Sequence, residues 1–381
     1  MTVLLQDEMQ FIWVPWEQEL DPAMRRAWTG LLSQRSDVLP TQHPAAWEIG
    51  RTIWPRAGWR ILLVQQGDRP IAVLPMVQRS PWSWSILDYL VQDFPPVVLA
   101  SGQEAAAWQA IGRWQRQAGI GQLLLGRSNS AKDIGPFHAA RLAGIATTQT
   151  PTLAGVELAL GDSEEAYMAG LHANARSHVR RAEARLQQEY ADFQLTTLTD
   201  PSSAAEPLAM LVHLYRQHWH QQVGGCVFDD PRMVEFFTQG MHTLLVQGRA
   251  AVHALQIDGR TVAAMTTLCE PGQRSAYFQF SGRDLHALSH RHSPGIIVLL
   301  RAIRHLRAQG VATLQLGSGA TWYKLEIGGV SRPQWQLATY RSAVAEAIVP
   351  RLEHATHLAR RAPVHLAYHW QRLRQCLGAA T

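Results

Sequence analysis

Charged residues are scarce in this chain: they make up 17% of its 381 residues, whereas 46% are hydrophobic. Disordered chains have the opposite balance, so we expect a globular protein, and the length predicts two domains, or about three small ones. No run of about 18 apolar residues is present to span a membrane. The N-terminus also lacks the features of a secretion signal, and we therefore expect a cytoplasmic protein.

Cysteine is nearly absent: the chain has three, far apart and without a CxxC pair. This pattern excludes a disulfide framework and a cysteine-rich zinc site, and it favours a reducing compartment. Three histidines, His286, His290 and His292, lie close together in sequence, but no acidic pair accompanies them. We therefore expect no metal site.

Lysine is the scarcest basic residue, because Lys132 and Lys324 stand against 33 arginines among the 35 basic residues. A GC-rich genome would account for most of this bias. Ammonium and guanidinium groups are not interchangeable, however, so a retained lysine indicates a role. The net charge of +5 is uneven, since residues 343–381 hold five Arg against two Glu. The rest is nearly neutral, which argues against general nucleic-acid binding and against a DNA partner.

Hydrophobic periodicity indicates two α/β halves that meet near residue 150. Apolar runs at 59–65 and 71–77 flank a Gln-Gly-Asp turn and predict a hairpin. A helix at 105–117 and a strand at 122–125 should follow.

The second half predicts a longer series of elements. We expect strands at 156–160, 193–198, 250–257, 261–270, 274–281, 313–316 and 334–340. We expect helices at 166–189, 204–221, 231–248 and 296–309, the third with Asp229 or Asp230 as its N-cap, and then a basic helical tail.

The start of the helix at 296–309 carries the most informative motif, Ser293-Pro294-Gly295. Proline in the first turn removes an N–H that the helix cannot use, and glycine lets a ligand approach the backbone. The remaining N–H groups and the positive end of the helix dipole suit a pyrophosphate. The same motif is also typical of an ordinary helix start.

Four segments of the second half resemble the CelD-type acetyltransferases, GNAT-superfamily relatives of the FemAB aminoacyl transferases. They are Asn174–Leu186, Tyr215–Trp219, Phe278–Gly282 with Ser293–Gly295, and Gly317–Lys324. The resemblance implies an α/β fold of tandem GNAT-like domains, with mixed, largely antiparallel sheets flanked by helices. Residues 1–150 would form a degenerate first domain, residues 151–342 the acyltransferase domain, and residues 343–381 the basic helical tail.

The same resemblance implies acyl-CoA as the donor and no metal. In GNAT enzymes a splayed strand donates a backbone N–H to the thioester carbonyl, here near Phe280 and Ser281, and the pyrophosphate would lie at Ser293-Pro294-Gly295. The usual signature, R/Q-x-x-G-x-G/A, is altered, because alignment on Gly295 puts His292 first and Ile297 last. Another thioester, a carrier protein or an aminoacyl-tRNA therefore stays open as the donor.

Tyr323 occupies a place comparable to that of the tyrosine that protonates the leaving thiolate in GNAT enzymes. Lys324, beside it, could hold an anionic group of the ligand, or pair with Glu326 or Asp284. For Tyr323 the alternative is a half-buried aromatic with a hydrogen-bonded hydroxyl, and for Lys324 it is a surface lysine.

His218 shares a predicted helix face with Tyr215 and Trp219, so the three could contact the acceptor, with His218 relaying a proton from its amine. A packing histidine beside a tryptophan is the alternative. Arg176 and Arg180 begin a basic stripe, completed by Arg181 and Arg185, that could bind an anionic acceptor or cofactor phosphate. A solvated helix face paired with Glu183 and Glu189 fits the same pattern.

These features predict an N-acyltransferase that moves an acyl group from acyl-CoA to an amine of a small molecule or an envelope polysaccharide precursor by direct attack. Two alternatives remain: an aminoacyl-tRNA-dependent transferase, and a non-catalytic subunit of an exopolysaccharide assembly. The mildly amphipathic tail could dock on a protein or an anionic membrane surface, or pack on its own domain.

Overall fold

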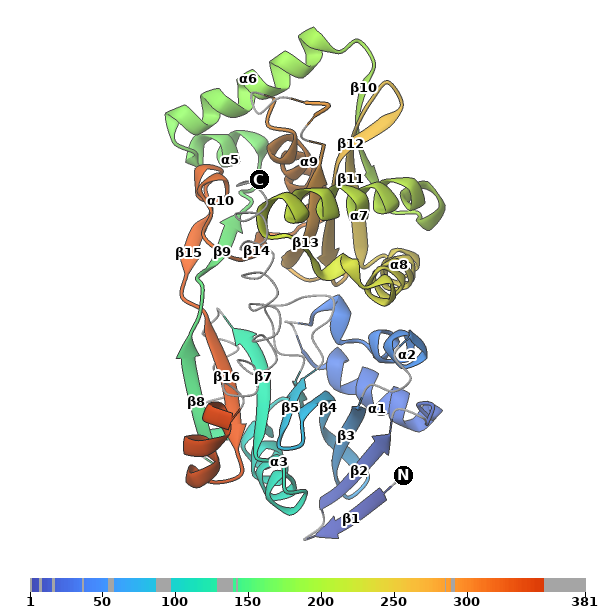
Figure 1. The fold of residues 1–381 in the computed structure, drawn as a ribbon, viewed down its shortest axis with the longest axis vertical. Coiled ribbons are helices and arrows are strands. Elements are labelled where there is room, and N and C mark those ends of the chain that lie inside the picture. Colours follow the sequence, from blue (N-terminus) through green and yellow to red (C-terminus); the bar gives the residue numbers. More distant parts are fainter. Residues whose placement is uncertain are drawn as a thin grey trace, which may run out of the picture.

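The computed structural model describes residues 2–6, 9–15, 18–35, 38–53, 58–86, 97–128, 140–141, 143–284, 286–288 and 292–352. Its strands form two sheets, stacked one above the other in Figure 1. The first sheet has the order β1 (Thr2–Gln6), β2 (Met9–Pro15), β3 (Trp59–Gln66), β4 (Arg69–Ser80), β5 (Ser83–Ile86), β7 (Gln122–Ser128), β16 (Trp335–Tyr340) and β8 (Ala146–Pro151), with β6 (Val98–Leu99) paired to β4.

The second sheet has the order β10 (Phe193–Leu198), β11 (Ala250–Ile257), β12 (Arg260–Cys269), β13 (Ser275–Arg283), β14 (Thr313–Ser318), β9 (Gly155–Ala159) and β15 (Val330–Arg332). Helices of the first lobe are α1 (Pro22–Ser33), η1 (Pro40–Gln42), α2 (Pro44–Ile53) and α3 (Glu104–Gln117). Those of the second are α5 (Glu164–Gly170), α6 (Ala173–Glu189), α7 (Pro201–Val223), η2 (Val227–Asp229), α8 (Pro231–Val246), α9 (Pro294–Ala308) and α10 (Trp322–Glu326).

The two sheets exchange strands along one side of the molecule (Figure 1). Strand β8 closes the first sheet, and the next strand, β9, enters the second sheet between β14 and β15. Strand β16 returns from β15 to the first sheet, where it pairs with β7 and β8. The strand predicted at 334–340 is therefore present, but it belongs to the sheet of the first half. The two sheets share a local order. A parallel pair (β5 and β7, or β13 and β14) is followed by a strand that continues from the edge strand of the other sheet (β16 or β9), and then by an edge strand (β8 or β15).

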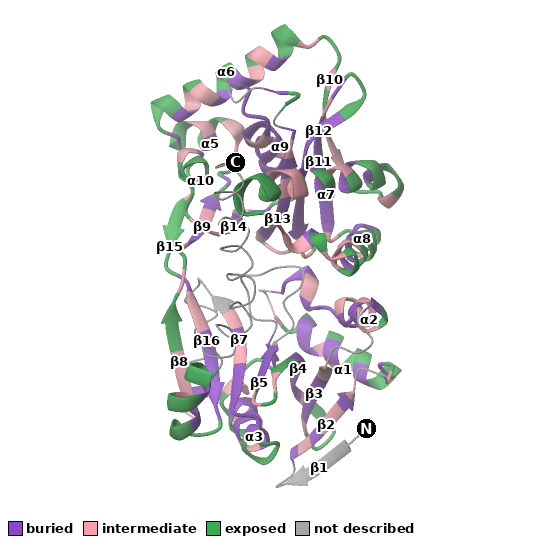
Figure 2. Cartoon of the chain, in the orientation of Figure 1, coloured by how far each residue is buried: buried purple, intermediate pink, exposed green. Residues whose placement is uncertain are grey.

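Each lobe has its own buried core, and a third buried cluster bridges the lobes through α2 and α8 (Figure 2). Ile53 of α2 joins the buried cluster that contains Phe236 and Phe237 of α8. At the same boundary, His43 Nε2 lies 3.1 Å from Glu270 Oε2, and Glu270 also accepts a hydrogen bond from Arg249. These contacts join the lobes across α2 and α8.

Local signals explain several helix boundaries. The Asp230 carboxylate accepts a hydrogen bond from the Arg232 N–H, and Pro231 occupies the first turn of α8, as predicted. Helix α7 begins after Asp200, whose carboxylate caps Ser202 and Ser203, and it ends at Gly224 with a φ of 80°.

Most of the predicted elements are confirmed, but the prediction of a single helix over 166–189 is wrong. The chain breaks there into α5 and α6, because Leu171 and His172 are extended. At the predicted meeting point of the two halves, near residue 150, the chain forms strand β8, which the sequence analysis did not predict. Residues 343–352 are helical, and the rest of the predicted tail lies outside the described residues. The division into domains at residue 150 stays a prediction.

Candidate active site

Strands β13 and β14 are parallel, and they separate soon after they begin. Their register covers Ser275–Tyr277 against Thr313–Gln315 and then ends, although both strands continue. Helix α9 connects the two strands, and its N-terminus follows the loop that leaves β13. This is the splayed strand pair, followed by a helix start, that the resemblance implies.

A bulge in β13 lies at the same level. The β12–β13 register shifts around Thr266, which faces both Gln279 and Phe280. The Phe280 N–H donates to Thr266 Oγ1 at 3.2 Å, and the Phe280 ring is buried against Tyr215 and Phe228. Phe280 thus has a partner for its N–H within the sheet. Ser281, the next predicted donor, is only partly buried.

Helix α7 lies directly on the end of β13. A Cβ at Gly282 would lie 2.8 Å from Leu214 Cβ and 2.9 Å from the Leu211 carbonyl oxygen, so only glycine permits this contact. The close approach holds Tyr215, His218 and Trp219 over the end of the strand. Trp219 keeps 36% of its surface exposed, as a residue that contacts an acceptor would.

His218 is held in its neutral form. Burial lowers the pKa of its imidazole, and the nearby Arg283 guanidinium lowers it further. Its Nδ1 atom is buried and has no hydrogen-bond partner among the described residues. A neutral imidazole with a free ring nitrogen can accept a proton.

Tyr323 lies near the same arginine. Burial raises the pKa of its phenol, and this effect outweighs the opposing influence of a hydrogen bond with Thr321 and of Arg283. The side chain stays protonated at neutral pH, and 37% of the residue surface is exposed. A protonated, accessible phenol can donate a proton.

Arg283 therefore lies within electrostatic range of both His218 and Tyr323, at the last residue of β13. Sequence reasoning missed it, because an arginine after Ser-Gly at a strand end has no motif of its own. The structure brings together the predicted base, the predicted acid and this unpredicted cation.

Lys324 is buried, with 6% of its surface exposed, rather than a surface lysine. Its Nζ donates to the Ser318 carbonyl oxygen at 3.0 Å, which fastens α10 to the end of β14. The two carboxylates suggested as its partners have other ones: Asp284 pairs with Arg260, and Glu326 pairs with His178. The lysine that sequence bias singles out thus joins the two elements that border the opening.

The N-terminus of α9 begins at Ser293, which is buried and has a left-handed backbone, with a φ of 48° and a ψ of 51°. A Cβ at Gly295 would meet no heavy atom within 4 Å, so this end of the helix has open space beside it. His292 is turned toward α6, where its Nε2 lies 2.7 Å from Glu189 Oε2. His290, one of the histidines considered for a metal, lies outside the described residues.

The predicted arginine stripe lines an open groove on α6. The groove has a volume of about 410 Å³ and is lined by Ala173, Arg176, Ser177, Arg180, Arg181 and Ala184. Arg176 also donates to carbonyl oxygens at the end of α5, including that of Ala169 at 3.0 Å. The stripe is therefore in part structural, while Arg180 and Arg181 add positive charge to the groove.

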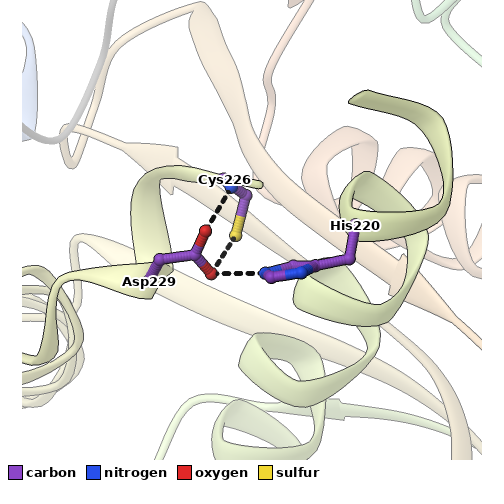
Figure 3. Close-up of side chains that lie close together, drawn as sticks. All are labelled: His220, Cys226 and Asp229. Carbon is purple, nitrogen blue, oxygen red and sulfur yellow. Dashed lines mark hydrogen bonds and ion pairs between the residues drawn. The ribbon is translucent and has the colours of Figure 1, made fainter. Parts of the chain in front are cut away.

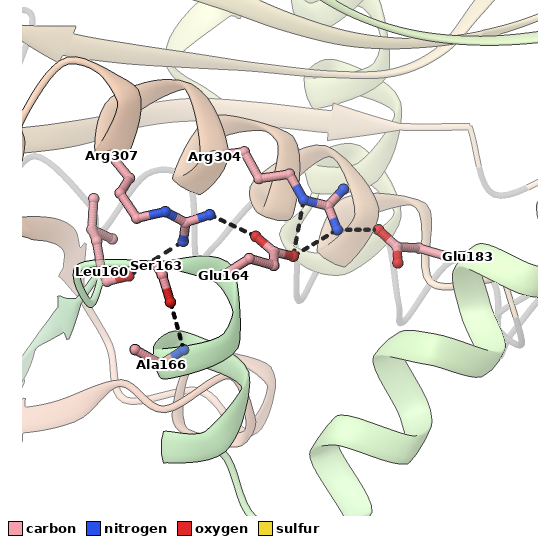
Figure 4. Close-up of polar contacts among 7 residues, drawn as sticks. All are labelled: Leu160, Ser163, Glu164, Ala166, Glu183, Arg304 and Arg307. Carbon is pink, nitrogen blue, oxygen red and sulfur yellow. Dashed lines mark hydrogen bonds and ion pairs between the residues drawn. The ribbon is translucent and has the colours of Figure 1, made fainter.

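Glu183, suggested as a partner of the stripe, pairs instead with Arg304 of α9 (Figure 4). Arg304 also binds Glu164 of α5, and Arg307 binds the other oxygen of Glu164 at 2.6 Å. These contacts join α5 and α6 to the C-terminal half of α9, the helix that starts after Ser293.

A separate polar cluster lies where α7 ends (Figure 3). His220, Cys226 and Asp229 each offer one ligand atom, and these atoms lie within 4.8 Å of one another. Asp229 Oδ2 accepts a hydrogen bond from the Cys226 backbone N–H, and Asp229 Oδ1 lies 2.7 Å from His220 Nε2. The sequence pattern gives no sign of this group, because its members are brought together by the turn after α7.

Comparison with known proteins supports the fold. Residues 173–325 match the family described as an acetyltransferase (GNAT) domain. No curated protein matches the chain. In the described residues, no helix is both long and apolar enough to cross a membrane.

Three solved structures share the fold over most of the chain. FemX is 9% identical, with a TM-score of 0.58, and the match covers 84% of this chain and 96% of that one. L-PGS from Bacillus licheniformis is 12% identical, with a TM-score of 0.54 and coverage of 87% and 96%. A protein of unknown function from Bacteroides thetaiotaomicron is 11% identical, with a TM-score of 0.56 and coverage of 83% and 97%. The predicted α/β class, with two mixed sheets flanked by helices, is confirmed.

Proposed function

We propose that the chain is an N-acyltransferase that moves an acyl group from acyl-CoA to an amine by direct attack. The observation that carries this proposal is the early separation of β13 and β14 beside the N-terminus of α9. Arg283, the last residue of β13, lies within electrostatic range of both His218 and Tyr323. The GNAT match over residues 173–325 spans all of these elements.

The residues at this opening supply what acyl transfer to an amine requires. His218, neutral near pH 7, takes a proton from the acceptor as the amine nitrogen attacks the thioester carbonyl. The C–S bond then breaks, and Tyr323 gives its proton to the leaving thiolate. Arg283 favours the negative charge that develops on the carbonyl oxygen or the thiolate. Tyr215 and Trp219 would contact the acceptor.

The donor would lie along the opening between the two strands. Its carbonyl would be near Phe280 and Ser281, with Ser281 the better candidate because the Phe280 N–H is bonded to Thr266. Its pyrophosphate would lie at His292, Ser293, Pro294 and Gly295, chiefly against the Gly295 N–H. Lys324 would position α10, and with it Tyr323, rather than bind the donor.

Release of free thiol from acetyl-CoA tests this proposal. We expect a panel of small amines and amino sugars to stimulate thiol release, with the acetyl group recovered on nitrogen. Stimulated release without N-acetylation would contradict the proposed acceptor chemistry. No thiol release and no binding of any acyl-CoA would contradict the donor.

The groove on α6 favours a second candidate, an aminoacyl-tRNA-dependent transferase. The neighbouring carboxylates Glu183 and Glu189 form ion pairs with Arg304 and His292 rather than with Arg180 or Arg181. A phosphate backbone could therefore lie on them. Filter binding at physiological salt would separate the candidates: tRNA binding that Arg180→Gln and Arg181→Gln weaken would favour the second, and acetyl-CoA binding without tRNA binding would favour the first.

A further inference from the structure

Three side chains beside the proposed donor site form a hydrogen-bonded row. Ser293 Oγ lies 2.8 Å from His178 Nε2, and His178 Nδ1 lies 2.9 Å from Glu326 Oε1. They come from separate elements: the N-cap of α9, the helix α6 and the last residue of α10. The His178 and Glu326 side chains are each 26% exposed, and Ser293 is 7% exposed. The three side chains are thus mostly buried, but solvent still reaches His178 and Glu326.

The polarity of this row follows from the chemistry of its ends. An ionised carboxylate can only accept hydrogen bonds, so Glu326 requires a hydrogen on His178 Nδ1. In the neutral ring Nε2 then has the lone pair, and the Ser293 hydroxyl donates to it. A serine hydroxyl that donates to a histidine oriented by a carboxylate is the arrangement of an activated nucleophile.

The backbone of Ser293 supports the same interpretation. Among the described residues, Ser293 and Asp258 are the two outside glycine with a positive φ. Asp258 lies in a hairpin turn, where this conformation is ordinary, whereas Ser293 starts a helix. A left-handed serine is strained, and such strain is retained where the surrounding structure holds a side chain in a required position.

A donor for an oxyanion lies next to the hydroxyl. Pro294 has no N–H, and the N–H groups of Ile296 and Ile297 both donate to the Ser293 carbonyl oxygen. The Gly295 N–H has no acceptor among the described residues, and the space beside Gly295 is open. One backbone donor and the positive end of α9 are therefore available for the charge that forms when Ser293 attacks a carbonyl.

We propose that Ser293, His178 and Glu326 form a nucleophilic site for activated acyl groups, either carboxylic esters or thioesters. The Ser293 oxygen attacks the carbonyl carbon while His178 Nε2 takes the hydroxyl proton. The bond to the leaving oxygen or sulfur breaks, and His178 returns the proton to that atom. The product is an acyl ester of Ser293, which water or an amine then cleaves with His178 again acting as base. Glu326 keeps the histidine in the tautomer that accepts the proton.

This site goes beyond the direct transfer proposed above, because it forms a covalent intermediate with different residues. Both sites use the Gly295 N–H, however, so they cannot be occupied together. If the pyrophosphate of a donor binds at the start of α9, coenzyme A should protect Ser293 from reagents. The two proposals can therefore fail separately.

A fluorophosphonate probe, which modifies activated serines without coenzyme A, tests the nucleophilic site. We expect one probe per chain, located on Ser293 by peptide mass spectrometry. With p-nitrophenyl acetate we expect a burst of nitrophenolate that approaches one equivalent. His178→Gln and Glu326→Gln should slow the labelling by at least about tenfold.

Ser163 provides a matched control, because it is also a helix N-cap serine but bonds to the Ala166 N–H instead of a histidine. Ser163→Ala should be labelled like the wild type, and Ser293→Ala should not be labelled. Thermal unfolding of each variant checks the fold. In Ser293→Cys, rapid alkylation by iodoacetamide that His178→Gln slows would show the same activation in a second reaction.

No labelling of the wild type, or labelling that survives Ser293→Ala, would overturn the proposal. Labelling at an unchanged rate in both His178→Gln and Glu326→Gln would also overturn it. Labelled Ser293 without protection by coenzyme A would leave the nucleophilic site intact and contradict the proposed phosphate site. Coenzyme A binding without labelling of Ser293 would support the proposed phosphate site and contradict the nucleophilic site.

Discussion

Arg283 links the chemistry of the proposed active site at the scale of single residues. It favours the neutral form of His218 and the ionised form of Tyr323. In the proposed reaction it would therefore assist a base that must be neutral to accept a proton and an acid that must give one up. Its place at the end of β13, next to Gly282, holds it close to both α7 and α10. One cation thus influences the pKa values of both proposed proton-transfer groups.

The pKa of His218 should respond to this cation. Burial and Arg283 both lower it below its ordinary value of about 6.5, so the neutral base should persist on the acid side of that pH. Arg283→Gln removes one of the two causes, and the pKa of His218 should rise toward 6.5. NMR titration, with the signal assigned by comparison with His218→Gln, measures it. A pKa above 6.5 in the wild type, or no rise in Arg283→Gln, would contradict this account.

Tyr323 should act on the chemical step and not on binding. Tyr323→Phe keeps the ring and removes the proton donor, so kcat should fall by roughly 100-fold while the affinity for acetyl-CoA changes little. Single-turnover kinetics and calorimetry measure the two quantities. An unchanged kcat would remove Tyr323 from the proton transfer.

Sequence reasoning reached individual site residues where a motif marks them. Tyr323 and His218 could be named because they lie in segments that resemble a known family. No sequence motif marks Arg283, and nothing in the sequence pairs His178 with Glu326, since these roles come from contacts between elements far apart in sequence. His178 and Glu326, for example, are 148 positions apart.

At the scale of elements, charged side chains hold α9 in place. Burial raises the pKa of Glu164, but hydrogen bonds from Arg304 and Arg307 outweigh it and leave the pKa lowered. The carboxylate of α5 is therefore bound to the helix that starts at Ser293, while Arg304 also binds Glu183 of α6. The orientation of this helix depends on charge as well as on its buried face.

Glu164→Gln should lower the free energy of unfolding by about 1 kcal/mol near neutral pH, because its side chain is partly exposed and screened. The stabilisation by Glu164 is fully present above its unfolded pKa of about 4.3 and is lost as the pH falls through the lower folded value. The difference between wild type and variant should therefore shrink below pH 4. Urea denaturation at several pH values measures it, and a constant difference would contradict the pairing.

The elements could be predicted where period and turn signals agree, as in the β11–β13 meander with its turns at Gly259 and Gly272. The break between α5 and α6 could not, because the sequence on either side is helical and the extended backbone at Leu171 is fixed by packing. Strand β8 was missed because its threonines are exposed or half-buried and show no apolar pattern.

At the scale of the whole molecule, the exchange of β9 and β16 makes each lobe incomplete without the other. The buried side chain of Leu337, on β16, belongs to the core of the first lobe, although more than 180 residues separate it from β8. The hydrophobic pattern predicts that a strand forms at 334–340 but not which of the two sheets it joins.

Leu337→Ala should therefore destabilise the first sheet. A buried Leu→Ala change costs roughly 2–5 kcal/mol, and the loss should appear as faster amide hydrogen exchange in β7 and β8. Strands β11 and β12, with no Leu337 contact in their core, should change less. Faster exchange confined to the second sheet would contradict the exchanged topology.

The central claim is that an acyl-CoA binds along the opening of β13 and β14 with its phosphates at the start of α9. Gly295→Leu tests it, because the new side chain enters open space and should leave the fold intact. We expect acetyl-CoA to bind the wild type with saturation and raise its melting temperature. The variant should keep the wild-type melting temperature without ligand and lose at least about tenfold in affinity, or more than 1.4 kcal/mol. Equal binding to both proteins, or no binding to the wild type, would contradict the claim.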